Sequence, residues 1–133
     1  MDHFLTSSNS LMRLVDEYYT HPQLVIGFDF DHTVHDYHNQ GHDYTCVISL
    51  LRELKDIGCK LICWTAHRDH VYVKEYLKKH SIPFDDVNTD GVVLGWESRK
   101  PFFNALLDDR SGLAQVYDEL SSLVKIVKYF DKQ

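Results

Sequence analysis

Residues 24–33 read LVIGFDFDHT, and they carry the strongest indication of the fold. Its first five residues form a continuous apolar run, which is typical of a short strand buried on both faces of a parallel sheet. The run ends abruptly in Asp29 and Asp31, with one residue between them. The sequence therefore predicts a central strand over 24–28 that carries two carboxylates to one edge of the sheet.

Two further apolar runs also end in polar residues. The run 61–64 is followed by Thr65, and the run 105–107 is followed by Asp108 and Asp109. In open parallel sheets, ligands bind beyond the carboxyl ends of the strands. We therefore expect the polar side chains that follow the three predicted strands to meet at one edge of the sheet and to form the functional site.

Apolar residues at helical spacing separate the predicted strands. Four segments show this spacing: Leu11 to Tyr19 behind a Ser8 or Ser10 cap and before Pro22, Val47 to Ile57 before Gly58, Val73 to Leu77 before Pro83, and Leu113 to Val127 after Gly112. Strands that alternate with helices imply right-handed crossovers and helices on both faces of a mostly parallel sheet. The sequence thus predicts an α/β, three-layer Rossmann-like fold.

No repeat, low-complexity tract or Pro/Gly-rich linker interrupts the chain. We expect one domain over residues 1–133, with an N-terminal helix within 1–22 packed on the core. Residues 86–94 have an ambiguous pattern, and a short edge strand over 92–94 is one interpretation. Trp64 is predicted to lie in the core, whereas Trp96 lies in an irregular segment and could stack on a base or ring.

Composition and charge disfavour several classes of protein. The 133 residues are 44% hydrophobic and 26% charged, a globular balance that argues against intrinsic disorder. The formal charge of −6 disfavours a general nucleic-acid binder. No stretch approaches the roughly 18 consecutive apolar residues of a membrane span, and no signal-peptide pattern is present. We expect a cytoplasmic protein that makes no membrane contact and keeps its cysteines as reduced, buried thiols.

Four carboxylates at one sheet edge need a compensating charge. Asp29, Asp31, Asp108 and Asp109 would repel one another unless a cation lay among them or their pKa values rose. Oxygen ligands without paired His or Cys favour Mg²⁺, which binds carboxylates together with substrate phosphate oxygens. The alternative is that these acids are helix caps and turn formers, since Asp is common after strands. Their recurrence after separate predicted strands favours the metal site.

The order of these residues resembles that of a known enzyme family. Residues 29–33, then Thr65, then Lys100, then residues 108–109 resemble the four motifs of the haloacid dehalogenase-like (HAD) hydrolase superfamily. The resemblance covers the chain from about residue 25 to residue 112. Its first and last motifs are the specific ones, because a lone Thr or a lone Lys carries little information.

The resemblance implies a phosphoaspartyl mechanism. Asp29 would attack the phosphorus atom in line, and Asp31 would protonate the leaving oxygen and later activate water. Mg²⁺ would be held by the carboxylates of Asp29 and Asp108 and by the main-chain carbonyl of Asp31. The choice between Asp108 and Asp109 as the direct ligand stays open.

Further residues are expected to contact the substrate. Thr65 is suited to donate a hydrogen bond to a phosphoryl oxygen, and Lys100 would add positive charge. The residues that follow Thr65 are candidate substrate contacts, namely Ala66, His67 and Arg68. Arg110, directly after the acidic pair, would either hold those carboxylates in place or contact substrate.

The motif spacings leave no room for a cap domain. Residues 32–43 form a short flap, and about 19 residues separate His80 from Lys100. An open, capless site suits a phosphate at the end of a larger molecule, or a site closed by a partner subunit. Separately, the N-terminal helix could form a homodimer, although nothing in its pattern demands one.

The flap contains several histidines, namely His32, His35, His38 and His42. They could form a second metal site or a phosphate-recognising cluster, because His is a common metal ligand. The alternative is a polar, mobile loop, since their spacings match no zinc signature. His32 also stands where the superfamily often has Gly.

These observations predict a Mg²⁺-dependent phosphomonoester hydrolase that forms an aspartyl phosphate. Its substrate would be a nucleotide or a nucleic-acid terminal phosphate, by analogy with capless polynucleotide 3′-phosphatases. The alternative is a catalytically idle, phosphate-binding interaction protein with the same fold. A phosphoacceptor receiver module is disfavoured, because it places its acidic pair early and its acceptor Asp alone at a later strand end.

Overall fold

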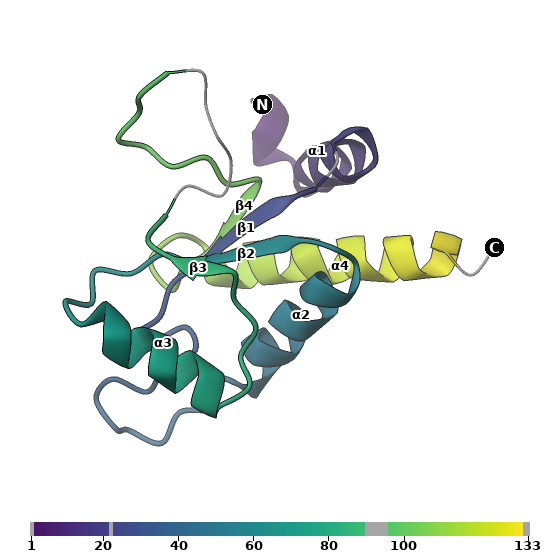
Figure 1. Cartoon of the computed structure of the whole chain (residues 1–133). Coiled ribbons are helices and arrows are strands. Elements are labelled where there is room, and N and C mark those ends of the chain that lie inside the picture. The colour runs from purple at the N-terminus through teal and green to yellow at the C-terminus, as the bar shows by residue number, and fades with distance from the viewer. Residues whose placement is uncertain (1, 22, 90–95, 132–133) are drawn as a thin grey trace.

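The computed structural model describes residues 2–21, 23–89 and 96–131 (Figure 1). At its centre lies a four-stranded sheet with strand order β3-β2-β1-β4, in which all strand pairs are parallel. The elements, in chain order, are η1 (His3–Leu5), α1 (Ser7–Thr20), β1 (Val25–Phe28), α2 (Thr45–Asp56), β2 (Lys60–Cys63), α3 (His70–Lys79), β3 (Asp86–Val87), β4 (Ala105–Leu107) and α4 (Leu113–Asp131). The predicted α/β, three-layer Rossmann-like fold with a parallel sheet is confirmed.

β1 is the central strand that the apolar run predicted. All four of its residues are buried, and it pairs with β2 on one side and with β4 on the other. Ile26 and Phe28 join a core to which α1, α2, α3 and α4 all contribute buried side chains, including Leu14 of α1. At Gly27 a Cβ would lie 2.8 Å from ring carbons of Phe103, so this position requires glycine's small size.

Parallel pairing brings the ends of β1, β2 and β4 to one edge of the sheet. Phe28 is in register with Cys63 of β2 and with Leu107 of β4. Just beyond the strands, Asp29 N–H donates to the carbonyl of Leu107, and Trp64 N–H donates to the carbonyl of Phe28, both at 2.8 Å. The residues that follow β1, β2 and β4 therefore start at the same edge of the sheet.

Some local expectations need correction. α1 begins at Ser7 with Thr6 as its N-cap, so the predicted Ser8 or Ser10 cap is wrong. Periodicity identifies the apolar face of a helix more precisely than its first residue. Among the described residues, β3 and β4 are the edge strands of the sheet, and the candidate strand over 92–94 lies outside the described residues.

Two side chains are more exposed than expected. Cys59 and Cys63 are buried free thiols, but Cys46 is exposed, because it precedes the inward-facing positions of α2. Trp64 is only partly buried and lines a cavity, so its assignment to the core is wrong. It directly follows the last residue of β2, at the end of the strand where the cavity lies. Trp96 is 70% exposed, in agreement with the expectation.

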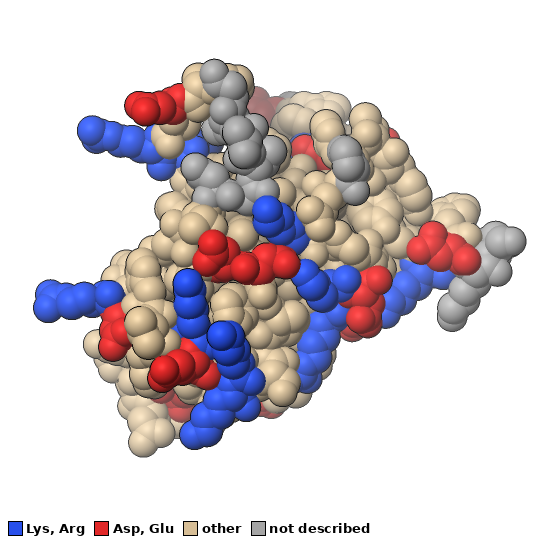
Figure 2. All heavy atoms as spheres, in the orientation of Figure 1, with Lys and Arg blue, Asp and Glu red and all other residues tan. Residues whose placement is uncertain are grey.

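The surface gives two negative findings. Among the described residues, no helix combines the length and the apolar character needed to cross a bilayer. On the face shown in Figure 2, Lys and Arg side chains are interspersed with Asp and Glu over α2 and α3. That face therefore lacks the uniformly basic patch that long nucleic acids require.

Candidate active site

A cavity of about 470 Å³ lies at the carboxyl ends of β1, β2 and β4. It is lined by Asp29, Asp31, His32, Trp64, Thr65, Ala66, Asn88, Asp108, Asp109 and Arg110. Most of the predicted site residues therefore come together, although they belong to three separate segments of the chain. The cavity lies where ligands bind in parallel α/β sheets.

Three carboxylates form a close group at this cavity. One oxygen each from Asp29, Asp108 and Asp109 lies within 4.8 Å of the others. Burial, a hydrogen bond with Asp109 and the nearby charge of Asp108 raise the pKa of Asp29 from 3.8 to about 7. Since like charges disfavour ionisation at this distance, a hard divalent cation would stabilise the ionised group. The oxygen-only set fits Mg²⁺, and both Asp108 and Asp109 belong to it.

We expect the pKa of Asp29 to make the metal-free protein less stable as the pH rises. The folded pKa of about 7 exceeds the ordinary value of 3.8, so between these pH values the folded state binds more protons than the unfolded state. Stability is therefore lost from about pH 4 to pH 7. Between pH 5 and pH 8 in chelator, the free energy of unfolding of the wild type should fall by about 1–2 kcal/mol relative to that of Asp29→Asn. This figure is smaller than the full pKa shift would give, because the carboxyl is partly exposed to solvent.

Urea unfolding at the two pH values measures this difference. Saturating Mg²⁺ should stabilise the wild type more at pH 8 than at pH 5, because the cation competes with the proton for Asp29. Parallel pH profiles of the two proteins in chelator would contradict the elevated pKa.

The carboxylate of Asp31 is held by a histidine of the flap. His35 Nδ1 lies 2.8 Å from Asp31 Oδ1, and the opposite ring nitrogen lies 3.3 Å from the Tyr72 hydroxyl. The imidazole also stacks on Phe30, with ring centroids 4.5 Å apart and an angle of 11° between the rings. Asp31 does not belong to the three-carboxylate group, and its contact with His35 fixes the orientation of its side chain at the cavity.

Three hydrogen bonds fix the loop after β4. The buried hydroxyl of Thr33 accepts from Asp109 N–H at 3.2 Å and lies 3.4 Å from Asp109 Oδ1. Asp108 Oδ1 accepts from the N–H of Arg110 at 2.9 Å. The first and last motifs are thus joined directly, so the motif Thr33 positions an aspartate 76 residues away in the sequence.

Asn88 fixes the loop after β2 and was missed by the sequence analysis. Its amide donates to the carbonyl of Thr65 and accepts from Thr65 N–H, both at 2.7 Å. Thr65 Oγ1 accepts from His67 N–H at 3.0 Å, which leaves the hydroxyl proton available to a ligand. An Asn just after an apolar position was the available signal, since Asn tolerates the positive φ of 52° seen here.

Three predicted contacts lie outside the lining of the cavity. Lys100 is exposed, and its N–H donates to Ser98 Oγ at 3.2 Å. Arg68 is exposed, and the ring of His67 stacks with Tyr72 at 5.5 Å. Their proposed roles stay predictions. Among the described residues that line the cavity, Arg110 is the one Lys or Arg.

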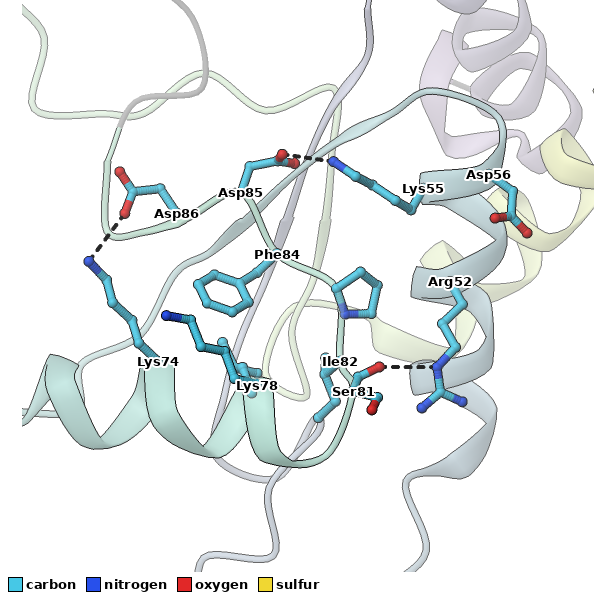
Figure 3. Close-up of a pocket in the computed structure, with 12 residues that line it drawn as sticks. Arg52, Lys55, Asp56, Lys74, Lys78, Ser81, Ile82, Phe84, Asp85 and Asp86 are labelled. Carbon is cyan, nitrogen blue, oxygen red and sulfur yellow. Dashed lines mark hydrogen bonds and ion pairs between the residues drawn. The ribbon is translucent and has the colours of Figure 1, made fainter.

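A larger hollow of about 960 Å³ lies between α2 and α3, and its lining does not include Asp29, Asp108 or Asp109 (Figure 3). Several of its cations already have partners in the protein: Lys55 with Asp85 at 2.7 Å, Lys74 with Asp86 at 3.6 Å, and Arg52 Nε with the carbonyl of Ser81 at 3.2 Å. These contacts join the helices to the segment before β3. We therefore take the smaller cavity, which the grouped carboxylates line, as the candidate site.

Comparison with known proteins supports the fold alone. No protein-family model and no curated protein matches this chain. A solved structure of a conserved protein from Bacteroides thetaiotaomicron is similar, with 22% sequence identity and a TM-score of 0.59. The match covers 75% of this chain and 91% of that chain.

Proposed function

We propose that this protein is a capless, Mg²⁺-dependent phosphomonoester hydrolase of the HAD type. One observation carries the proposal, namely that Asp29, Asp31, Thr65, Asp108 and Asp109 line a single cavity at three strand ends. Phosphoryl transfer to an aspartate requires a carboxylate that attacks phosphorus, a second carboxyl that is held apart from it, and a group of acidic residues close together.

The metal would be held by the three-carboxylate group. Asp29 and either or both of Asp108 and Asp109 offer oxygens within 4.8 Å of one another, and the resemblance adds the main-chain carbonyl of Asp31. When bound, Mg²⁺ neutralises these carboxylates and the phosphoryl oxygens. Arg110, at the rim of the same cavity, adds a permanent positive charge toward the phosphate dianion.

The proposed reaction has two steps. A carboxylate oxygen of Asp29 forms a bond to phosphorus while the bond to the leaving oxygen breaks, and Asp31 gives its proton to that oxygen. Water then attacks the same phosphorus, Asp31 takes the water's proton, and the bond from phosphorus to Asp29 breaks. Thr65 would hydrogen-bond a phosphoryl oxygen through its available hydroxyl proton. The net products are an alcohol and inorganic phosphate.

The first test is phosphate release from an aryl phosphate. We expect turnover with Mg²⁺, loss to background in chelator, and recovery when Mg²⁺ is restored, because four acidic side chains at the site need a cation to admit a phosphate. Calorimetric Mg²⁺ binding without turnover, on this substrate and on a panel of phosphorylated nucleotides, would contradict the hydrolase. That result would favour the idle phosphate-binding protein.

A further inference from the structure

His32 has a strained backbone conformation at the edge of the cavity. Its φ is +64°, a region that residues with a Cβ rarely adopt, and His32 lines the same cavity as Asp29. Glycine would make this turn without strain. Strained positions of this kind concentrate at functional sites, so the strain at His32 indicates that its imidazole has a function.

The ring of His32 begins a cluster that extends from the cavity to the surface. Its centroid lies 5.0 Å from that of His38 and 6.1 Å from that of Tyr37, and the last two rings lie 4.9 Å apart. Tyr37 is 55% exposed, and His38 is exposed. We name His32, Tyr37 and His38 the aromatic rim.

The aromatic rim lies on a loop with internal hydrogen bonds. The carboxylate of Asp36 accepts from the N–H groups of Gln40 and Gly41, at 3.1 Å and 2.7 Å. Tyr37 N–H donates to the carbonyl of His35, the residue that holds Asp31. These hydrogen bonds hold the rings in position without a ligand. Binding would therefore cost little conformational entropy in the loop.

We propose that the aromatic rim binds the base of a nucleoside monophosphate whose phosphate lies at Asp29. This inference rests on the proposed function and names its substrate class. Planar bases stack on His and Tyr rings, and the imidazole nitrogens and the phenol hydroxyl can hydrogen-bond base edges. The base is neutral, so the protein's charge of −6 does not oppose its binding, whereas it opposes the further phosphates of a long nucleic acid.

A matched pair of substrates isolates the base. Adenosine 5′-monophosphate and ribose 5-phosphate share the sugar and the phosphate, so the ratio of their kcat/KM values reports recognition of the base. We expect the wild type to favour the nucleotide about tenfold to a hundredfold. His38→Ala and Tyr37→Ala should each reduce this preference about three- to tenfold, whereas Tyr37→Phe, which keeps the ring, should retain most of it.

Two further variants serve as controls. His32→Gly removes a ring and the backbone strain together, so it should lower the preference while the protein stays folded. Tyr129→Ala removes a ring that is 63% exposed on α4 and should leave the preference unchanged.

The outcomes separate this inference from the proposed hydrolase. Equal kcat/KM for the two substrates in an active enzyme overturns the aromatic rim and leaves the hydrolase intact. Turnover of the aryl phosphate but of neither of these two compounds likewise overturns the aromatic rim and leaves the hydrolase intact. If the aryl phosphate and the nucleotide panel are not turned over either, the hydrolase fails, and the affinities of Asp29→Asn for both compounds with Mg²⁺ still decide the base subsite. A terminally phosphorylated oligonucleotide preferred over the mononucleotide would overturn the free nucleotide as the ligand and identify a nucleic-acid end instead.

Discussion

Asp29→Asn is expected to lower kcat for phosphate release by about 10⁴-fold or more, because the amide cannot form the acyl phosphate. Asn keeps the size of the side chain, and it removes one negative charge from a group of three carboxylates. The variant should therefore fold, with a stability at neutral pH equal to or above that of the wild type. The measurement is turnover of an aryl phosphate at saturating Mg²⁺, so that weaker metal binding does not cause the loss.

A matched control and a direct observation complete this experiment. Asp118→Asn changes an exposed carboxylate on α4 and should leave kcat unchanged. Acid quenching of the wild type during turnover, followed by peptide mass spectrometry, should place a phosphoryl group on Asp29. Full turnover by Asp29→Asn, or a phosphoryl group on another residue, would reject Asp29 as the nucleophile.

Asp31→Asn is expected to show the second-largest loss, and the loss should depend on the leaving group. Removal of a general acid typically lowers rates by about 10²–10⁴-fold. An alkyl phosphate, whose leaving oxygen needs a proton, should lose more than an aryl phosphate, whose leaving group departs readily as an anion. The comparison of kcat for the two substrates in wild type and variant measures this difference.

The same series tests the role of His35 as a positioning residue. Its Nδ1 holds Asp31 Oδ1 at 2.8 Å, so His35→Ala should follow the leaving-group dependence of Asp31→Asn with a smaller loss. His35→Asn can restore part of the rate, because its amide can donate to the same carboxylate. Equal losses on both substrates in Asp31→Asn would be inconsistent with proton transfer by Asp31.

The local pattern of the sequence was sufficient to predict the framework of the candidate site. The continuous run 24–28 could be assigned to a central strand because a strand buried on both faces shows no alternation. Parallel pairing then fixed where Asp29, Thr65 and Asp108 would lie, since the carboxyl ends of parallel strands share an edge. These are properties of neighbouring residues and of general sheet geometry, so no knowledge of distant contacts was needed.

Side-chain partners could not be obtained in the same way. His35 was grouped with the flap histidines, but its ring holds Asp31 and stacks on Phe30. Asn88 lay in a segment without periodicity, and its contact with Thr65 spans 23 positions. Such contacts depend on loop geometry and on side-chain orientation, and a short polar segment specifies neither through its pattern.

The fold class, the central strand and the set of carboxylates beyond the strands could thus be predicted from the amino-acid sequence, because hydrophobic periodicity and strand order encode them. The folded chain was needed to show that Asn88, Trp64 and His32 line the cavity and that Lys100 lies outside its lining. The physical reason is that the position of a side chain at a sheet edge depends on the loops that follow the strands. Those loops are fixed by hydrogen bonds between residues far apart in the chain, such as Thr33 with Asp109.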